Sequence, residues 1–129
     1  MSEEKKGVVL SLADVILLNE ELKHMNKEKE ISFVLKYKLS KLLEKTEQSV
    51  KNFNDKKLSL FKKYGKEVKG SPGTFSLKGG TKANEKKGLE ELEGLITIEE
   101  TFTEQYPLND FSNLKSEVGY NVIYRFLVE

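Results

Sequence analysis

Apolar residues between positions 12 and 25 recur at the three- and four-residue spacings of a helix that buries one narrow face. Ser11 precedes them, and Asp14 follows it three positions later, which is the pattern of a helix N-cap. We therefore expect a first helix of about 14 residues to begin at Ser11. Its apolar positions are Leu12, Val15, Ile16, Leu22 and Met25.

A much longer helix is expected from Ile31 to Tyr64, because this stretch contains neither Pro nor Gly. Gly65 then offers the left-handed conformation that commonly ends a helix. The short charged connection of residues 26–30 predicts that the two helices return antiparallel as a helical hairpin. The apolar seam of the long helix comprises Leu35, Leu39, Leu42, Thr46, Val50, Phe53, Leu60 and Tyr64.

The difference in length between the two helices gives the first functional expectation. At about 1.5 Å per residue, the long helix spans roughly 50 Å and the first helix only roughly 20 Å. The far half of the seam therefore needs another cover, which is the C-terminal segment, a second copy of the chain or a different protein. The residues expected to form an interaction surface there are Val50, Phe53, Leu60, Phe61 and Tyr64, supported by Lys56 and Lys63.

A Gly- and Pro-containing connector follows the long helix at residues 66–83, and within it residues 74–77 alternate like a short strand. The β-branched run of residues 95–102 predicts a second strand, and we expect the two strands to pair. Between them, Asn84 has the form of an N-cap for a short helix that Gly94 closes.

The last segment fits both a helix and a strand, and we expect a helix, with Asn109 or Asp110 and then Ser116 capping helical turns. The helical pattern is Val118, Val122, Ile123, Phe126 and Leu127; the strand pattern is Tyr120, Val122, Tyr124, Phe126 and Val128.

The predicted fold class is mainly α (α+β), with an N-terminal antiparallel helical hairpin that includes one long helix, a small two-stranded β element and a C-terminal helix. Length predicts a single domain, residues 1–129. Its parts are the hairpin (11–65), the connector (66–83) and an acidic C-terminal part (84–129).

Charge is distributed unevenly behind a formal net charge of +1. Residues 27–69 contain 13 lysines and 6 acidic residues, whereas residues 84–129 contain 10 acidic and 4 basic residues. The two regions could therefore dock on each other electrostatically, which would neutralise much of the basic surface.

One strip of the long helix carries lysines and no acidic residue. Such a strip can follow a phosphate backbone, meet an acidic protein surface or simply be solvated. Arg125 is the only arginine, and lysine lacks the planar fork preferred for phosphates, which argues against nucleic acid without excluding it. The lysines of the strip are Lys38, Lys41, Lys45, Lys56 and Lys63.

Few residues could carry catalysis. The chain has no Cys, and its single histidine, His24, is expected on the solvated side of the first helix. The carboxylates within residues 90–93 and 99–100 could form a hard-metal site, but adjacent acids are usually just solvated. We therefore predict no catalytic residue, no metal site, no cofactor and no enzymatic activity.

The first ten residues contain an apolar run of only three, which is too short for a signal peptide or a membrane span. We expect a soluble cytoplasmic protein that has no membrane partner.

Several stretches together resemble a family of small uncharacterised proteins from tailed bacteriophages. They are residues 41–45, 58–65, 89–93, 96–99 and the closing segment 107–127. The resemblance implies a phage-encoded accessory protein of the host cytoplasm, with or without association with the virion. It carries over no catalytic residue. The roles it implies are assembly of the virion, a structural place in the head or tail, or modification of a host protein.

These observations leave three functional hypotheses. The leading one is a non-enzymatic, phage-type accessory protein that self-associates or binds a virion or host protein. A nucleic-acid-binding accessory that uses the lysine strip is the second. The third is an inhibitor of a host defence protein that uses the acidic residues of 84–129.

Overall fold

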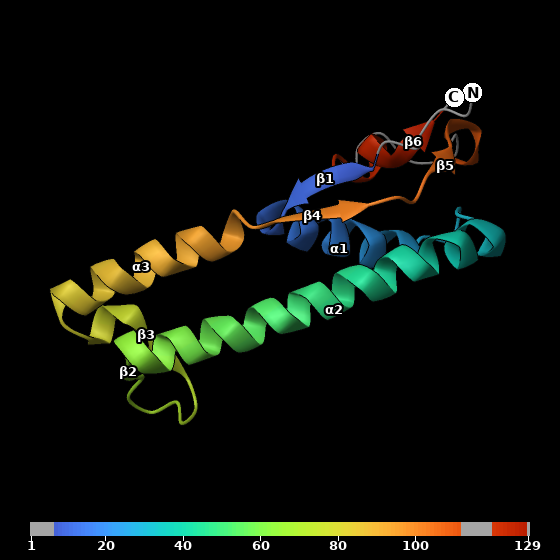
Figure 1. Ribbon diagram of the computed structural model, residues 1–129. Coiled ribbons are helices and arrows are strands. Elements are labelled where there is room, and N and C mark those ends of the chain that lie inside the picture. The colour runs from blue at the N-terminus through green and yellow to red at the C-terminus, as the bar shows by residue number, and fades with distance from the viewer. Residues whose placement is uncertain (1–6, 112–119, 129) are drawn as a thin grey trace. The chain divides into compact units, whose positions relative to one another are not determined.

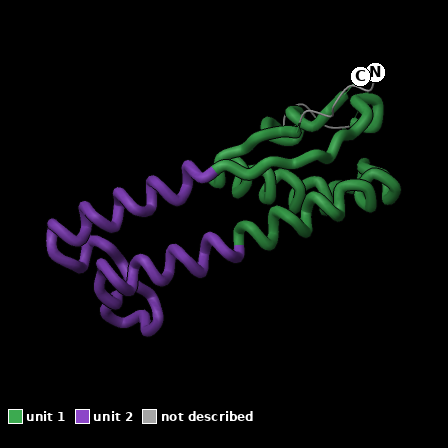
Figure 2. The backbone as a smooth tube through the Cα atoms, in the orientation of Figure 1, with its two compact units in different colours: residues 1–50, 99–129 green, residues 51–98 purple. Residues whose placement is uncertain are grey.

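The computed structural model describes residues 7–111 and 120–128 (Figure 1). These residues form three α-helices and three two-stranded sheets, so the predicted mainly α fold with some β structure is confirmed. The chain divides into two compact units, which Figure 2 colours separately. Unit 1 combines residues 1–50 with 99–129, and unit 2 comprises residues 51–98.

Helix α1 (Leu12–Lys27) begins where the sequence predicted. The Ser11 hydroxyl accepts a hydrogen bond from the Asp14 backbone N–H at 3.2 Å, which satisfies one of the unpaired donors of the first turn. One stripe of the helix is buried. Leu18 belongs to this stripe and is fully buried, whereas Ile16, which we expected in the stripe, is only partly buried. The buried residues are Leu12, Val15, Leu18, Asn19, Leu22 and Met25.

Helix α2 (Phe33–Tyr64) starts two residues later than expected, because the Ser32 hydroxyl accepts the Leu35 N–H at 3.1 Å and acts as its cap. Its first half lies beside α1 in the predicted hairpin (Figure 1). The Asn19 side chain joins the two helices by donating to the Thr46 hydroxyl at 3.1 Å and to the Glu47 carboxylate at 3.0 Å. In this half the predicted seam is buried at Leu35, Leu39, Leu42 and Thr46.

The strand β4 (Glu99–Phe102) pairs antiparallel with β1 (Val8–Ser11), in a register that runs from Val8 opposite Phe102 to Ser11 opposite Glu99. The expected pairing of residues 95–102 with 74–77 is therefore wrong. The apolar run at the start of the chain is a four-residue strand, and it offers β4 a partner of equal length. Strand β1 also leads directly into α1, so the ladder packs against that helix.

The end of the chain forms a single 3-10 turn, η4 (Ile123–Phe126), and then β6 (Leu127–Val128). The helix expected here is thus shorter and tighter within residues 120–128, while Ser116 and Val118 lie outside the described residues. Strand β6 pairs in parallel with β5 (Tyr106–Pro107), and a second 3-10 turn, η2 (Leu108–Phe111), follows β5. This pairing draws the last residues into an extended conformation that a longer helix could not adopt.

Glu21 of α1 holds the closing segment in place. Its carboxylate accepts three backbone hydrogen bonds, from the N–H groups of Asn121, Val122 and Ile123, at 3.1, 3.0 and 2.9 Å. Arg125 adds an ion pair with Asp14 at 3.1 Å. Burial of Val122, Ile123 and Phe126 completes the contact, so polar and apolar interactions both fix this segment on unit 1.

Unit 2 contains the second half of α2, a hairpin and helix α3 (Lys82–Ile96). The N-cap of α3 is Thr81, whose hydroxyl accepts the Asn84 N–H at 3.2 Å. The expectation that Asn84 caps this helix is wrong, because threonine offers the same chemistry three residues earlier. Gly94 does not close the helix either and lies in its last turn.

The hairpin of unit 2 pairs β2 (Lys66–Glu67) with β3 (Phe75–Ser76), and the turn η1 (Leu77–Gly79) follows. Its loop contains Gly70 and Gly73, both with φ of 84°, a conformation that glycine adopts without a steric penalty.

Gly65 ends α2 for a steric reason. Its φ is not positive, so the predicted left-handed cap is wrong. A Cβ atom at this position would lie only 2.2 Å from the carbonyl oxygen of Ser76. Glycine is therefore required because the backbone of β3 approaches the end of the helix too closely for any side chain.

We expect Gly65→Ala to lower the free energy of unfolding by about 1–3 kcal/mol, because the backbone of β3 would have to shift. The matched control is Gly94→Ala, where a Cβ meets nothing within 4 Å. That change should raise stability by about 0.5–1 kcal/mol through helix propensity. Urea denaturation measures both, and a neutral Gly65→Ala would contradict the close approach.

Glu21→Gln should weaken all three backbone hydrogen bonds and cost about 1–3 kcal/mol. Amide hydrogen exchange at Asn121, Val122 and Ile123 should accelerate. The neighbouring exposed residue provides the control, since Glu20→Gln should change stability by less than about 0.5 kcal/mol. Equal effects of the two substitutions would show that Glu21 does not hold the closing segment.

Candidate functional site

The first turns of α2 expose three large apolar side chains. Phe33 is 87% exposed, Tyr37 78% and Val34 66%. At about 100° per residue, these three and the lysines 38 and 41 lie within an arc of roughly 140°. The arc points away from the seam of Leu35, Leu39 and Leu42. We call it the proximal face, defined by Phe33, Val34, Tyr37, Lys38 and Lys41.

Positive charge surrounds these apolar groups. Residues 33–43 contain three lysines and no acidic residue, and the N-terminal end of a helix adds a partial positive charge of its own. The ammonium of Lys36 also lies 5.6 Å from the centre of the Phe33 ring. The proximal face thus combines exposed aromatic surface with positive charge on the same helical turns.

Two lysines of the predicted strip are held by acidic residues from the C-terminal part of the chain. Lys38 pairs with Asp110 of η2 at 3.1 Å, and Lys45 pairs with Glu104. These contacts lie within unit 1 and neutralise part of the strip. Lys41 lies between them and makes no ion pair with a described residue, so it retains its charge for an external ligand.

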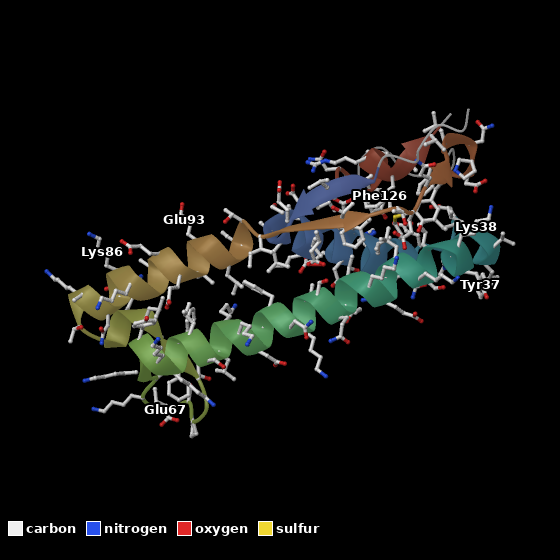
Figure 3. All side chains as sticks on the ribbon, viewed as in Figure 1. Tyr37, Lys38, Glu67, Lys86, Glu93 and Phe126 are labelled. Atoms are coloured by element: carbon white, nitrogen blue, oxygen red, sulfur yellow. The ribbon has the colours of Figure 1, made fainter. Side chains whose placement is uncertain are left out.

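A pocket of about 380 Å³ adjoins the proximal face. Side chains from α2 form one wall, and the residues before and within β5 form the other; Figure 3 labels Tyr37 and Lys38, which project from this end of α2. The lining residues are Tyr37, Lys38, Lys41, Gln105, Tyr106 and Pro107. Two lysines and an amide beside two tyrosines suit an anionic group attached to an apolar one.

Tyr106 is the buried polar group of this pocket. The residue is 5% exposed, and its hydroxyl has no hydrogen-bond partner among the described residues. Burial, assisted by the charge of Glu104, raises the pKa of Tyr106 well above its usual value. Like any tyrosine hydroxyl it is protonated at neutral pH, and the raised pKa shifts its ionisation further into the alkaline range.

The residues predicted for an interaction surface on the far half of α2 are less exposed than those of the proximal face. Phe53 is buried, and Val50, Leu60, Phe61 and Tyr64 are half-buried. In unit 2, Gly88 of α3 packs closely on Tyr64 and Leu77, where a Cβ would lie 3.3 Å from one side chain and 2.6 Å from the other. The chain itself thus covers part of this seam.

The two lysines predicted to support that surface, Lys56 and Lys63, are exposed. The Lys63 ammonium lies 5.0 Å from the ring centre of Tyr64, and Lys57 lies over Phe53 and Phe61 at 5.7 and 6.0 Å. Half-buried aromatic rings covered by lysine chains present less apolar surface than the proximal face does.

The sequence contains a signal for the proximal face that did not enter the prediction of an interaction surface. Phe33, Val34 and Tyr37 are apolar but fall outside the seam of Leu35, Leu39 and Leu42. A helix rarely places three large apolar residues on its solvent side within two turns unless something binds there. Their proximity to Lys38 and Lys41 could also be read from the spacing.

His24 has more contacts than a solvated histidine. Its Nδ1 lies 2.8 Å from the Tyr120 hydroxyl and 3.4 Å from the Glu28 carboxylate. A pocket of about 330 Å³ adjoins it, lined also by Lys27, Glu28, Lys29 and Glu30. Tyr120 is itself buried, and burial followed by the charge of Glu28 raises its pKa to about 12.

Across residues 7–111 and 120–128, no three His, Asp or Glu side chains come together as metal ligands. In the same part of the chain, no helix is both long and apolar enough to cross a bilayer.

Comparison with known proteins gives no match: no family model, no curated protein and no solved structure is similar to this chain.

Stability should depend on pH above pH 10. A tyrosine whose pKa is higher in the folded state than in the unfolded state stabilises the fold while it is protonated. This contribution to the free energy of unfolding is fully present below the unfolded-state pKa near 10, and it is lost as pH rises toward the folded-state pKa. For Tyr120 that window is about pH 10–12, and the loss is about 1.4 kcal/mol per pH unit at most. Tyr120→Phe should flatten the decline measured by urea unfolding; an unchanged slope would contradict the assignment.

Proposed function

We propose that this chain has no catalytic activity and functions by binding another protein through the proximal face. The observation that supports this most is the exposure of Phe33 and Tyr37, one helical turn apart on a regular helix. Isolated exposed apolar residues are common on soluble proteins, but a cluster rimmed by charge is typical of interaction sites. Aromatic side chains also supply much of the binding energy in protein interfaces.

Charge argues against self-association through this face. A two-fold dimer centred on these lysines would bring Lys38 and Lys41 of one copy toward the same residues of the other, and like charges in an interface are costly. An acidic partner has no such penalty. We therefore place a different protein, and not a second copy, on the proximal face.

The nucleic-acid alternative has less support. Lys38 and Lys45 of the strip are already paired with acidic residues, and a phosphate backbone would have to compete with both. Inhibition through the acidic part of the chain is disfavoured for the same reason, because Glu104 and Asp110 are engaged within unit 1. The origin implied by the phage resemblance stays a prediction, and the protein-binding roles of such proteins are compatible with this proposal.

Selection from a library of random peptides of about a dozen residues, displayed to the immobilised full chain, tests the proposal. We expect enrichment of peptides with aromatic or large aliphatic residues. Tyr37→Ser and Phe33→Ser should each weaken their binding at least about tenfold, because they remove exposed anchors. Fluorescence anisotropy with synthetic peptides measures the affinities.

The matched control is Tyr124→Ser, which removes a tyrosine that is 44% exposed elsewhere in unit 1. It should leave peptide affinity unchanged. Circular dichroism verifies that each variant is folded. If no peptide is enriched, or if Tyr124→Ser is as harmful as Tyr37→Ser, the proximal face is not the binding site.

A further inference from the structure

We infer that the pocket beside Tyr37 is a carboxylate-binding site, and that the partner inserts an Asp or Glu side chain there, next to apolar residues that cover Phe33 and Val34. This inference rests on the proposed function and specifies the partner's chemistry. It follows from three features of the pocket: its cations, its apolar lining and the carboxylate already bound to one of its lysines.

The cations come first. Lys38 and Lys41 are three residues apart on α2, so both ammonium groups can reach one ligand at the mouth of the pocket. Gln105 adds an amide from the opposite wall. A single carboxylate can accept hydrogen bonds from all of these groups, whereas a neutral ligand would leave the ammonium of Lys41 without compensation.

Apolar surface completes the pocket. Tyr106 is 95% buried by area and its hydroxyl is closed to solvent, so we assign it no hydrogen bond to the ligand. Tyr37 and Pro107 line the pocket beside the two lysines, and their apolar surface suits the aliphatic chain of an Asp or Glu residue.

The carboxylate of Asp110 shows that this edge already binds the proposed group. Asp110 contacts the Lys38 ammonium at 3.1 Å and comes from η2, directly after β5. Because both carboxylates would use Lys38, Asp110 is an internal competitor of the partner. Removing its charge should therefore strengthen binding of an acidic ligand.

A phosphate ligand fits these residues less well. The pocket contains no arginine, and the strip beyond it is interrupted where Lys45 pairs with Glu104. A nucleic acid needs a continuous track of cations, whereas one acidic side chain needs only the two lysines of the pocket. The aromatic surface of Phe33 and Tyr37 then contacts the apolar neighbours of that acidic residue.

The test uses the full chain and the peptides selected above, each compared with a version in which Asp or Glu is replaced by Asn or Gln. We expect the selected peptides to contain an acidic residue beside apolar ones. Neutralising that residue, or making Lys41→Gln, should each weaken binding about tenfold, and the two changes together should do little more. Asp110→Asn should strengthen binding severalfold.

Lys56→Gln is the matched control, since it removes an exposed lysine of the same strip in unit 2 and should have no effect. Selected peptides that are neutral, depend on Tyr37 and ignore Lys41→Gln would overturn the carboxylate site but leave the proposed function intact. Failure to select any peptide would remove both. Binding of a single-stranded oligonucleotide that is weakened equally by Lys41→Gln and Lys56→Gln would replace this inference with a nucleic-acid site.

Discussion

The hydrogen bond from Asn19 to Thr46 is the constraint on which the rest of unit 1 depends. Both residues are essentially inaccessible to solvent, whereas the other polar contacts between α1 and α2, from Asn19 and Lys23 to Glu47, lie nearer the surface. Leaving either group unpaired would cost about 1–3 kcal/mol, so a displacement of α1 along α2 by one turn is strongly disfavoured. Apolar contacts alone would tolerate such a shift. On α2 itself, Leu35, Leu39 and Leu42 share the buried face, and Phe33 and Tyr37 lie on the opposite, exposed side.

Helix α1 organises the remainder of unit 1 through polar contacts as well. The Glu21 carboxylate captures the backbone at residues 121–123, and this places β6 next to β5. Strand β5 in turn brings Tyr106 and Pro107 opposite α2, where they form the second wall of the pocket. The candidate site is therefore assembled from segments far apart in the sequence, and each step of the assembly uses a specific hydrogen bond or ladder.

Local chemistry explains which features could be predicted from the sequence. The Ser11 cap, the length of α2 and the buried seam of its first half depend only on neighbouring residues, and all three were predicted correctly. The partner of β4, the reason for Gly65 and the pocket depend on backbone segments that meet only in the folded chain. Thr81 was missed as a cap because Asn84 offered equivalent chemistry nearby. The apolar residues 33, 34 and 37 lie outside the predicted seam, so their exposure could have been predicted from the sequence as well.

The pairing of β1 with β4 has a consequence for how the chain becomes structured during synthesis. Residues 8–11 are synthesised well before their ladder partner, residues 99–102, which follows all of unit 2. Unit 2 is contiguous in sequence, so its own contacts can form while β1 is still unpaired. Loop closure over nearly ninety residues then precedes completion of unit 1, and contacts of such high sequence separation slow folding. Strand β1 therefore stays unpaired while all the intervening residues are synthesised, and its apolar residues are open to chaperones until residues 99–102 have been made.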